Sequence, residues 1–335
     1  MKNNTIVITG AAGFIGSAIL LDFLKNGFQV IASDKKYIES FQDWGLQDTV
    51  SKACKSKQLK YLRGDIRDKA FCNTLFNSGD VLIHQAALTS VAESYREASL
   101  YNEVNVVGYQ NIVGAAMSAG VRKVVYASSS AVDTKTIDPE FERPNKIISP
   151  YGKTKASNER FSQKIALETG ASFTGLRYYN VVGNDVHWIR NSEAVIAKWI
   201  KEAISRGTIT VFGNGNQIRD FCSIKHVVIA NVRSTLFPKF GSARVIGVGS
   251  GSGVSINDLS QVLKEIFVAK FNNTKDIEIL TDQLVDPGSL MSVANSVDCS
   301  STLGFQVLGN LNEMLSTLFE NIEEILDSEG AFKTR

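Results

Sequence analysis

The stretch TGAAGFIG, Thr9 to Gly16, follows a short apolar run and precedes an amphipathic segment. Its three glycines, Gly10, Gly13 and Gly16, have the G-x-x-G-x-x-G spacing of a strand-to-helix turn. Glycines let the backbone turn sharply and approach a pyrophosphate, whose negative charge the N-terminus of a helix stabilises. This stretch therefore predicts an α/β fold that begins with a dinucleotide-binding turn.

The rest of the first half alternates apolar runs with amphipathic stretches, which is typical of parallel strands joined by crossover helices. We expect strands at residues 5–10, 29–34, 59–65, 80–87, 123–130 and 172–180. We expect helices at residues 71–77, 100–119 and 149–168. The pattern predicts a doubly wound parallel sheet.

Beyond Asn180 the pattern is mixed, with expected helices at residues 193–206, 256–267 and 311–326 and a strand and turn at 208–221. We therefore predict two domains. Residues 1–180 form the cofactor-binding domain, and residues 181–335 form a mainly substrate-binding C-terminal region whose elements are interleaved with the first domain.

The composition excludes several classes of protein. The 335 residues are 44% hydrophobic and 21% charged, with a net charge of +2, and the basic residues are scattered. Neither a nucleic-acid nor an anionic membrane surface is predicted, whereas small anionic ligands remain open. The segment 5–24 is apolar, but three glycines and Asp22 interrupt it, and it lacks the features of a signal peptide.

The four cysteines are far apart in the sequence and have no C-x-x-C spacing. This arrangement predicts neither a zinc site nor a disulfide framework, so we expect no metal. A reducing, cytoplasmic location fits this cysteine usage best.

An acidic residue, Asp34, ends the second expected strand 18 residues after Gly16. A carboxylate there can accept hydrogen bonds from the ribose hydroxyls of an adenosine, and it repels a 2′-phosphate. It favours NAD over NADP, although Lys35 and Lys36 act in the opposite direction. The alternative interpretation of Asp34 is a solvated turn residue.

A tyrosine and a lysine stand four residues apart in SPYGKTKASNE, Ser149 to Glu159. On a helix, Tyr151 and Lys155 project from the same face. They are either a phenol packed over a lysine stem or a chemical pair in which the ammonium lowers the pKa of the phenol. In the second case the tyrosinate accepts a proton near neutral pH.

The fifth expected strand ends in three serines within VYASSSAVD, Val125 to Asp133. Ligands bind at this carboxyl edge of open α/β sheets, although a serine run is also typical of a capped loop. Together with Tyr151 and Lys155 it forms a Ser/Tyr/Lys set. In such a set the serine orients a substrate hydroxyl, the tyrosinate removes its proton, and a nicotinamide accepts the hydride. The lysine keeps the phenol ionised and holds the nicotinamide ribose.

With these motifs the chain resembles the extended short-chain dehydrogenase/reductase family, in its NAD-dependent sugar-nucleotide epimerase/dehydratase branch. The resemblance spans nearly the whole chain and rests on TGAAGFIG, GDIRD, HQAA, YASSSAV, SPYGKTKASNE, LRYYNVVG and FGNGNQIRDF in family order. It implies a Rossmann-type doubly wound parallel sheet with a smaller mixed α/β substrate-binding region. It also implies a homodimer, in which the helices near 100–119 and 149–168 form a four-helix bundle.

The resemblance assigns roles to individual residues. The catalytic residues it implies are Ser129, Tyr151 and Lys155. The cofactor-binding residues it implies are Gly10, Gly13, Phe14, Ile15, Gly16, Asp34, Asp65, Ile66, Ala86, Ala87, Tyr151, Lys155 and Tyr178. The substrate-binding residues it implies are Ser129, Ser130, Tyr151, Asn180, Val211, Phe212 and Arg219, of which Asn180 and Arg219 match residues that hold a pyrophosphate.

The two residues after the catalytic serine indicate the branch of the family. Dehydratases of this family carry Asp-Glu there and decarboxylating relatives carry a glutamate, whereas this chain has Ser130-Ala131. The resemblance thus favours a 4-epimerase that acts through a 4-keto intermediate on a UDP-hexose or UDP-N-acetylhexosamine, in polysaccharide or lipopolysaccharide precursor synthesis. A reductase, a dehydratase or a C3/C5 epimerase remains an alternative, and a non-catalytic NAD-sensing scaffold is a weaker one.

Three positions depart from the family pattern. Residues 132–134 read V-D-T instead of V-Y-G, and the loop at 184–191 is irregular. Asp286, in VDPGSL, stands where the family generally has an arginine that contacts the nucleotide phosphates. We therefore expect Arg219 to carry a larger share of phosphate binding than in relatives.

Overall fold

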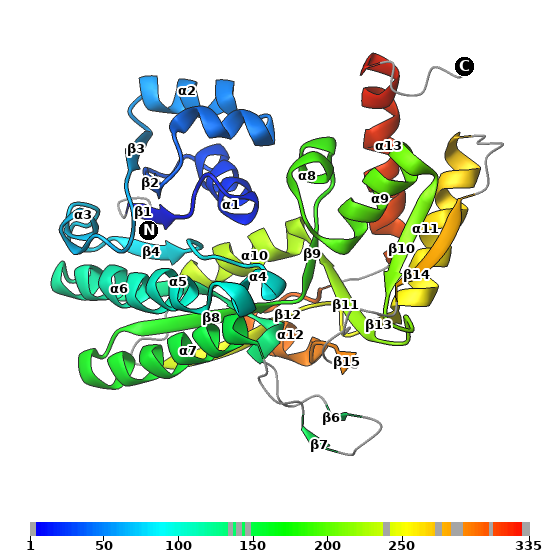
Figure 1. Ribbon diagram of the computed structural model, residues 1–335. Coiled ribbons are helices and arrows are strands. Elements are labelled where there is room, and N and C mark those ends of the chain that lie inside the picture. Colours follow the sequence, from blue (N-terminus) through cyan, green and yellow to red (C-terminus); the bar gives the residue numbers. More distant parts are fainter. Residues whose placement is uncertain are drawn as a thin grey trace.

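The fold is centred on a seven-stranded parallel sheet (Figure 1). The computed structural model describes residues 5–132, 137–138, 143–144, 149–236, 242–271, 277–282, 291–307 and 311–329. The strands of the sheet are β1 (Ile6–Thr9), β2 (Val30–Asp34), β3 (Leu59–Arg63), β4 (Val81–His84), β5 (Lys123–Ser129), β8 (Ser172–Tyr178) and β12 (Ala243–Val248). Their order is β12-β8-β5-β4-β1-β2-β3, and every neighbouring pair is parallel. The predicted doubly wound sheet is confirmed, but its seventh strand, β12, was not predicted.

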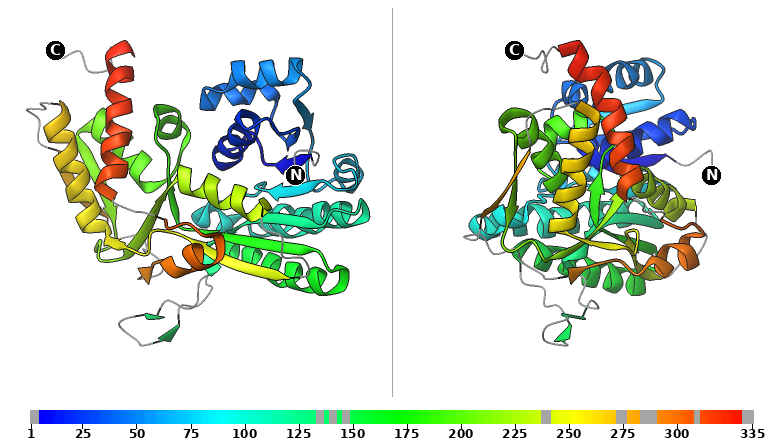
Figure 2. Two further views of the ribbon diagram at one scale, coloured as in Figure 1. Left: turned by 180° about the vertical axis from the view of Figure 1, so that it is seen from behind. Right: turned by 90° about the vertical axis from the view of Figure 1, so that its right-hand side faces the viewer.

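Alternate residues of these strands enter two different cores, because successive side chains of a strand point to opposite faces. Ile6 and Ile8 pack into one core, and Val7 between them packs into the other. Helices cover both faces (Figure 2). The first core is closed by α1 (Phe14–Lys25), α2 (Gln47–Lys55), α10 (Ile224–Leu236) and α12 (Ser296–Leu303). The second is closed by α3 (Lys69–Asn73), α6 (Gly108–Ser118) and α7 (Pro150–Thr169).

The helix expected at residues 100–119 is interrupted by a π-helical turn. It divides into α5 (Ala98–Asn102), the π-turn η2 (Glu103–Val107) and α6. Inside this turn, the Asn105 side chain donates to the carbonyl of Leu88 at 2.9 Å and accepts from its N–H at 2.8 Å. Such turns are frequent near functional sites, and this one ties the helix to the loop that follows β4. The other short elements of this half of the chain are η1 (Ile38–Trp44), α4 (Val91–Arg96), η3 (Ser130–Val132), β6 (Ile137–Asp138) and β7 (Arg143–Pro144).

A smaller mixed region stands beside the main sheet, on the right in Figure 1. Its helices are α8 (Val186–Asn191), α9 (Val195–Arg206), α11 (Ile256–Phe271) and α13 (Leu311–Glu329). Its strands are β9 (Asn180–Val182), β10 (Thr208–Phe212), β11 (Ile218–Ser223), β13 (Gly253–Ser255), β14 (Glu278–Asp282) and β15 (Met291–Ser292). Trp188, Trp199 and Phe319 lie in its separate hydrophobic core. The strand and turn expected at 208–221 are two strands, β10 and β11, which pair with different partners.

The loop at 184–191, expected to be irregular, contains the helix α8, whose first turn is capped by Asp185 accepting from the N–H of Trp188 at 2.9 Å. β12, α10 and α12 follow residue 181 in the chain, yet they join the main sheet and its covering layer. The division of the chain into domains at residue 180 stays a proposal. In the part of the chain that the structure describes, no helix is both long and apolar enough to cross a membrane.

Candidate active site

The turn after β1 accepts only glycine at two of its positions. Gly10 has a φ of +71°, and a Cβ there would lie 2.5 Å from the backbone nitrogen of Ala86. A Cβ on Gly16 would overlap the carbonyl oxygen of Gly10. Because Ala86 follows β4, the turn is pressed against the point where the strand order reverses, which is where open α/β sheets bind their ligands.

Gly13 is the N-cap of α1, and no side chain in the described ranges caps the N-terminus of this helix. The N–H groups of a first helical turn have no acceptor within the helix. In α1 these groups belong to Phe14 and its neighbours Ile15 and Gly16. The turn therefore offers backbone donors and the positive end of the helix dipole to an anion.

The carboxylate of Asp34 is held in place at the end of β2 by two backbone donors. Its Oδ2 accepts from the N–H of Ala12 at 3.0 Å, and its Oδ1 accepts from the N–H of Lys36 at 3.1 Å. Each oxygen keeps a second lone pair, so both can still accept from a ribose. Asp34 is thus fixed rather than free to swing into solvent.

A cavity of about 220 Å³ lies at this edge of the sheet. Most of the predicted cofactor-binding residues line it: Gly10, Gly13, Asp34, Asp65, Ile66, Ala86 and Ala87. The two cations Lys35 and Lys36 line it as well. The structure therefore brings together residues from four separate strand ends that the sequence predicted as one site.

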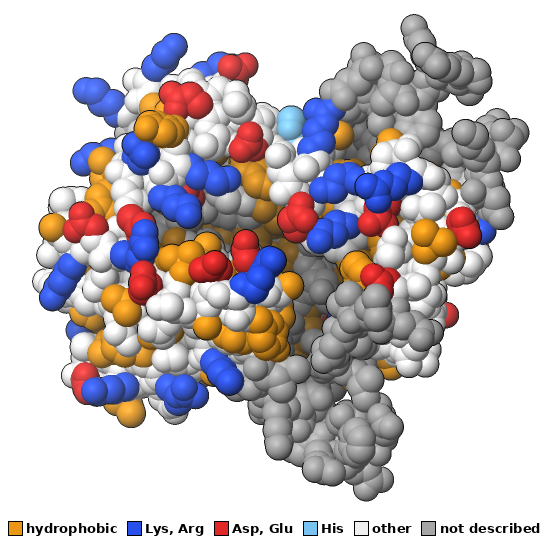
Figure 3. Space-filling model, in the orientation of Figure 1, with side chains coloured by type: hydrophobic (Ala, Val, Ile, Leu, Met, Phe, Trp, Pro, Cys, Tyr) orange, Lys and Arg blue, Asp and Glu red, His pale blue; other side chains and the backbone are white. Residues whose placement is uncertain are grey.

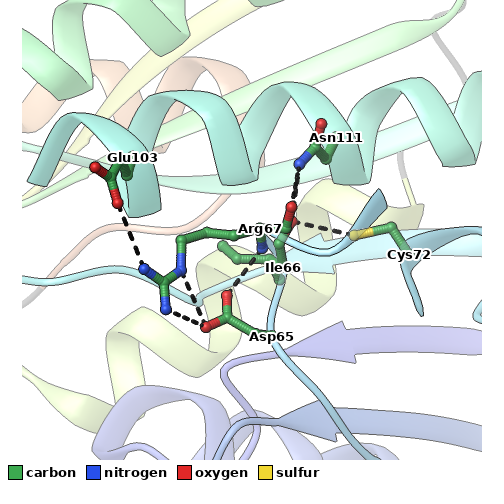
Figure 4. A network of polar contacts seen from close by, with 6 residues as sticks. All are labelled: Asp65, Ile66, Arg67, Cys72, Glu103 and Asn111. Atoms are coloured by element: carbon green, nitrogen blue, oxygen red, sulfur yellow. Dashed lines mark hydrogen bonds and ion pairs between the residues drawn. The ribbon is translucent and has the colours of Figure 1, made fainter. Parts of the chain in front are cut away.

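A network of polar contacts fixes the loop after β3 at the rim of this cavity (Figure 4). Arg67 donates to the Asp65 carboxylate at 2.8 and 3.1 Å and lies 3.5 Å from Glu103. The hydrogen bond from Arg67 lowers the pKa of Asp65. Asn111 donates to the carbonyls of Arg67 at 3.0 Å and Ile66 at 3.3 Å. These exposed ion pairs add little stability, but they hold Asp65 against η2; the role of Arg67 was not predicted from the sequence.

Ser129, Tyr151 and Lys155 come together at the carboxyl end of β5. Ser129 ends that strand, and the other two lie in the first turns of α7, whose N-cap is Ser149. The Lys155 ammonium lies 5.8 Å from the centre of the Tyr151 ring and donates to the carbonyl of Ala127 at 2.9 Å. The Ser129 hydroxyl is hydrogen-bonded to the Tyr151 phenol. The predicted set is therefore assembled, with the serine on the phenol rather than on the lysine.

Burial controls the ionisation of this set. Tyr151 is 8% exposed and Lys155 is 2% exposed. Burial raises the pKa of Tyr151, and the hydrogen bond with Ser129 only partly opposes that rise. Burial also lowers the pKa of Lys155 to about 8. Burial therefore moves the pKa of the phenol in the direction opposite to the one expected from the neighbouring lysine.

A glutamate on α7, not predicted from the sequence, binds the strand β5 at the residue before Ser129. Glu159 Oε1 accepts from the Ser128 hydroxyl at 2.5 Å and from Arg177 Nε at 2.9 Å. Its Oε2 accepts from the same guanidinium at 2.8 Å. Both partners of this ion pair are largely shielded, with side-chain exposures of 12% and 19%. A two-point arginine–carboxylate contact of this kind is geometrically specific.

Tyr151, Lys155 and Glu159 are spaced by four residues and form one stripe on α7. Each contacts a different residue of the segment 127–129 in β5: the phenol binds residue 129, the ammonium residue 127 and the carboxylate residue 128. The stripe sets the register of α7 against β5, and the four-residue spacing is the signal by which Glu159 could have been found.

The phenol of Tyr178 belongs to a closed ring of hydrogen bonds. It donates to Gln85 Oε1 at 3.3 Å, Gln85 Nε2 donates to Asn231 Oδ1 at 3.1 Å, and Asn231 Nδ2 donates back to the phenol at 2.8 Å. Burial raises the pKa of Tyr178. The ring joins the ends of β4 and β8 to α10, and Gln85 also lines the cofactor cavity. The direct role of Tyr178 toward a cofactor stays a prediction.

A second cavity, of about 310 Å³, lies in the mixed region and contains the predicted residues Asn180, Phe212 and Arg219. Its other walls are mostly apolar and are formed by Val181, Val182, Trp188, Ala194, Val195, Ile196, Gln217, Phe221 and Ile256. Asn180 donates to the carbonyl of Asp220 at 2.6 Å, and burial lowers the pKa of Arg219. Val211 is buried in the core behind this cavity. The molecular face in Figure 3 is hollowed between the main sheet and this region.

Two of the three departures from the family pattern involve residues outside the described ranges: Asp133 and Thr134 in the first, and Asp286 in the other. Ser130 begins the turn η3, and Val132 is buried at its end. In this turn the N–H of Ala131 donates to Ser129 Oγ at 3.2 Å. Of the two residues that follow Ser129, Ala131 thus contacts it through the backbone, and neither carries a carboxyl group.

Comparison with known proteins agrees with this geometry. The model of the family described as "NAD dependent epimerase/dehydratase family" matches residues 6–249. The UDP-glucose 4-epimerase of Rhizobium meliloti (strain 1021) is 27% identical over 293 residues, which are 81% of this chain and 84% of the relative. The human dTDP-D-glucose 4,6-dehydratase is 28% identical over 288 residues, 84% of this chain and 79% of the relative. The solved UDP-glucose 4-epimerase of Thermotoga maritima with UDP-glucose matches with a TM-score of 0.79 and 27% identity over 96% of this chain and 99% of that one.

Proposed function

Because the chain belongs to the NAD-dependent epimerase/dehydratase family, we propose that it is a nucleotide-sugar 4-epimerase acting on a UDP-hexose or UDP-N-acetylhexosamine. The family confirms the predicted resemblance, the NAD cofactor and the enzyme class. The sugar, the nucleobase and the reaction within the family belong to the proposal. It rests mainly on the Ser129–Tyr151–Lys155 set, in which Ser129 is followed by Ser130-Ala131 and not by the acidic residues of the family's dehydratases.

The cofactor cavity fits NAD in shape and charge. The turn at Gly10 and Gly13 has no side chain to keep a pyrophosphate away, and the uncapped first turn of α1 offers it N–H donors. Asp34, held by two N–H groups, accepts from the adenosine ribose. Asp65 and Ile66 lie at the opposite rim, where we place the adenine. Bound NAD supplies the acceptor and later the donor of the C4 hydride, together with a positive charge that favours the tyrosinate.

The chain's own residues handle the proton of the reaction. Tyr151, once ionised, accepts the proton of the sugar hydroxyl at C4 as the C4–H bond breaks, which leaves a 4-keto sugar. Ser129, whose hydroxyl lies against the phenol, is placed to hold that oxygen by a hydrogen bond. When the hydride returns to the other face of C4, Tyr151 gives the proton back, so atoms and electrons balance with no net oxidation. Lys155 opposes protonation of the phenol and positions the nicotinamide ribose.

The absence of an acidic residue at the two positions after Ser129 favours epimerisation over dehydration. Loss of water from a 4-keto sugar requires one group to remove a proton and another to protonate the leaving hydroxyl. Ser130 and Ala131 occupy the positions at which the family's dehydratases carry such groups, and neither side chain is acidic. This observation supports the proposed reaction against the dehydratase alternative.

We place the nucleotide in the second cavity. Arg219 there is a cation for the phosphates, and the apolar walls with Phe212 suit a planar base. The second cavity lies between α9 and Asn180, which follows β8. This location is on the carboxyl side of the main sheet, where Ser129, Tyr151 and Lys155 lie.

Further parts of the proposal concern assembly and context. Val91, Tyr95, Val107 and Leu167 are exposed on α4, η2 and α7, and hydrophobic side chains gather over this part of the face in Figure 3. Such a surface suits a homodimer built through a four-helix bundle, which light scattering during size-exclusion chromatography would test. We further propose a cytoplasmic location and a role in polysaccharide or lipopolysaccharide precursor synthesis.

The test is incubation of the purified enzyme with UDP-, dTDP-, GDP- and CDP-sugars without added cofactor, followed by separation of the products. A 4-epimerase inverts C4 at many turnovers per enzyme with its retained NAD. In a parallel incubation with NADH, its stoichiometric consumption would identify a reductase, and in either incubation a product that has lost water would identify a dehydratase. Either of these results would contradict the proposed reaction while leaving the family intact.

A further inference from the structure

One oxygen in the wall of the second cavity has no partner among the described residues. Gln217 lines this cavity and is only 5% exposed. Its Nε2 donates to the carbonyl of Phe212 at 3.1 Å, which fixes the orientation of the carboxamide, because a carbonyl accepts only from the nitrogen. The Oε1 atom is buried, and within the described part of the chain no group donates to it.

An unpaired buried acceptor is unusual, since more than nine in ten buried polar groups have a hydrogen-bond partner. It also costs folding free energy. The hydrogen bond to Phe212 orients the carboxamide, and the backbone that carries it is held as well: the N–H of Ile256 donates to the carbonyl of Gln217 at 3.1 Å, and the N–H of Asn257 donates to that of Gly215 at 3.0 Å. Gln217 is thus a rigidly placed acceptor in need of a donor.

The position of Gln217 relates it to Arg219. Gln217 directly precedes β11 and Arg219 is the second residue of that strand, so the two are two residues apart and lie on the same side of the extended chain. Both line the same cavity, whose walls include the apolar side chains of Val195, Ile196 and Phe212. A ligand that suits this cavity carries an anion for the guanidinium, a flat apolar body for the walls and a hydrogen-bond donor for Gln217 Oε1.

We propose that Gln217 Oε1 accepts a hydrogen bond from the nucleoside of the substrate and is a specificity-determining contact of the enzyme. This inference rests on the proposed function, which places the nucleotide in this cavity. The donor is either the N3–H of a uracil or thymine or a hydroxyl of the ribose. Cytosine presents an acceptor at N3, so a contact with the N3–H would exclude it.

The test measures binding of UDP and three analogues by titration calorimetry, with wild type and Gln217→Met. Methionine is similar in length to glutamine and has no carbonyl acceptor. We expect the variant to bind UDP about 2- to 10-fold more weakly. Wild type should show a similar loss with one analogue only: 3-methyl-UDP if the donor is N3–H, 2′-deoxy-UDP or 3′-deoxy-UDP if it is a hydroxyl. The variant should not distinguish that analogue from UDP.

The variant also loses the contact with Phe212, but that loss weakens the binding of all four ligands alike. The coupling between variant and analogue, which is the difference between their effects alone and together, therefore reports only the contact of Gln217 Oε1. Gln47→Met is the matched control, because Gln47 lies in α2 outside both cavities and its Oε1 is also buried without a partner in the described chain. It should leave UDP binding unchanged. Equal affinity of wild type and Gln217→Met for UDP, or an equal loss with every ligand, would overturn the inference. If the coupling is found but no UDP-sugar is epimerised, the proposed function fails and the contact stands.

Discussion

Lys155 should destabilise the folded protein at neutral pH. Burial moves its pKa from the usual 10.5 to about 8, so the folded chain binds this proton more weakly than the unfolded chain does. Below pH 8 both states are protonated and the penalty is complete; above pH 10.5 both are neutral and it vanishes. As this penalty is lost, the free energy of unfolding rises with pH between about 8 and 10.5, by a total on the order of 3 kcal/mol.

Lys155→Met removes the titrating group and with it this penalty. The variant also loses the hydrogen bond to the carbonyl of Ala127, but that loss does not vary with pH below 8. The stability of the variant relative to wild type should be greatest near pH 7 and should decline as the pH rises toward 10. We would measure urea unfolding of cofactor-free protein by tryptophan fluorescence at pH 7, 8, 9 and 10.

The matched control is Lys153→Met, which changes an exposed lysine on the same helix. Its stability should follow that of wild type across this range. A difference between wild type and Lys155→Met that stays constant from pH 7 to 10 would refute the argument, because it would mean that the buried ammonium keeps an ordinary affinity for its proton.

Three further predictions concern the turn, the stripe and the second cavity. Gly10→Ala should purify with little NAD, because its Cβ would press on the backbone of Ala86; full cofactor content by absorbance would contradict this. Glu159→Gln should lower kcat about tenfold with little change in KM, since it weakens charge-assisted contacts that set the register of α7; a higher KM with normal kcat would argue against a positioning role. Arg219→Ala should weaken UDP binding about 10- to 150-fold by calorimetry, and a loss below threefold would place the phosphates elsewhere.

Features that depend on neighbouring residues were predictable from the sequence. The spacing of the three glycines predicts the turn. The four-residue spacing of Tyr151 and Lys155 predicts that they lie on the same face of a helix. The start of that helix is equally local, because Ser149 is its N-cap and Pro150 is its first residue. These signals were sufficient for the parallel sheet and for the residues that meet at its carboxyl edge.

Features that depend on distant residues were not predictable in the same way. β12 pairs with β8 from beyond residue 240, and a short apolar run gives no sign of its partner. The ring of Tyr178, Gln85 and Asn231 spans up to 146 residues of sequence. The raised pKa of Tyr151 arises from burial, which the spacing to Lys155 does not reveal.

The central claim is that one hydride leaves C4 and returns to it on the opposite face, with Tyr151 moving the proton. The direct measurement uses UDP-glucose and UDP-N-acetylglucosamine labelled with deuterium at C4, incubated with the enzyme without added cofactor and analysed by NMR and mass spectrometry. The account predicts a C4-inverted product that retains the deuterium at C4, and loss of this product in Tyr151→Phe by about 10²- to 10⁴-fold in rate. Inversion with release of the deuterium to water, or undiminished turnover in Tyr151→Phe, would contradict it.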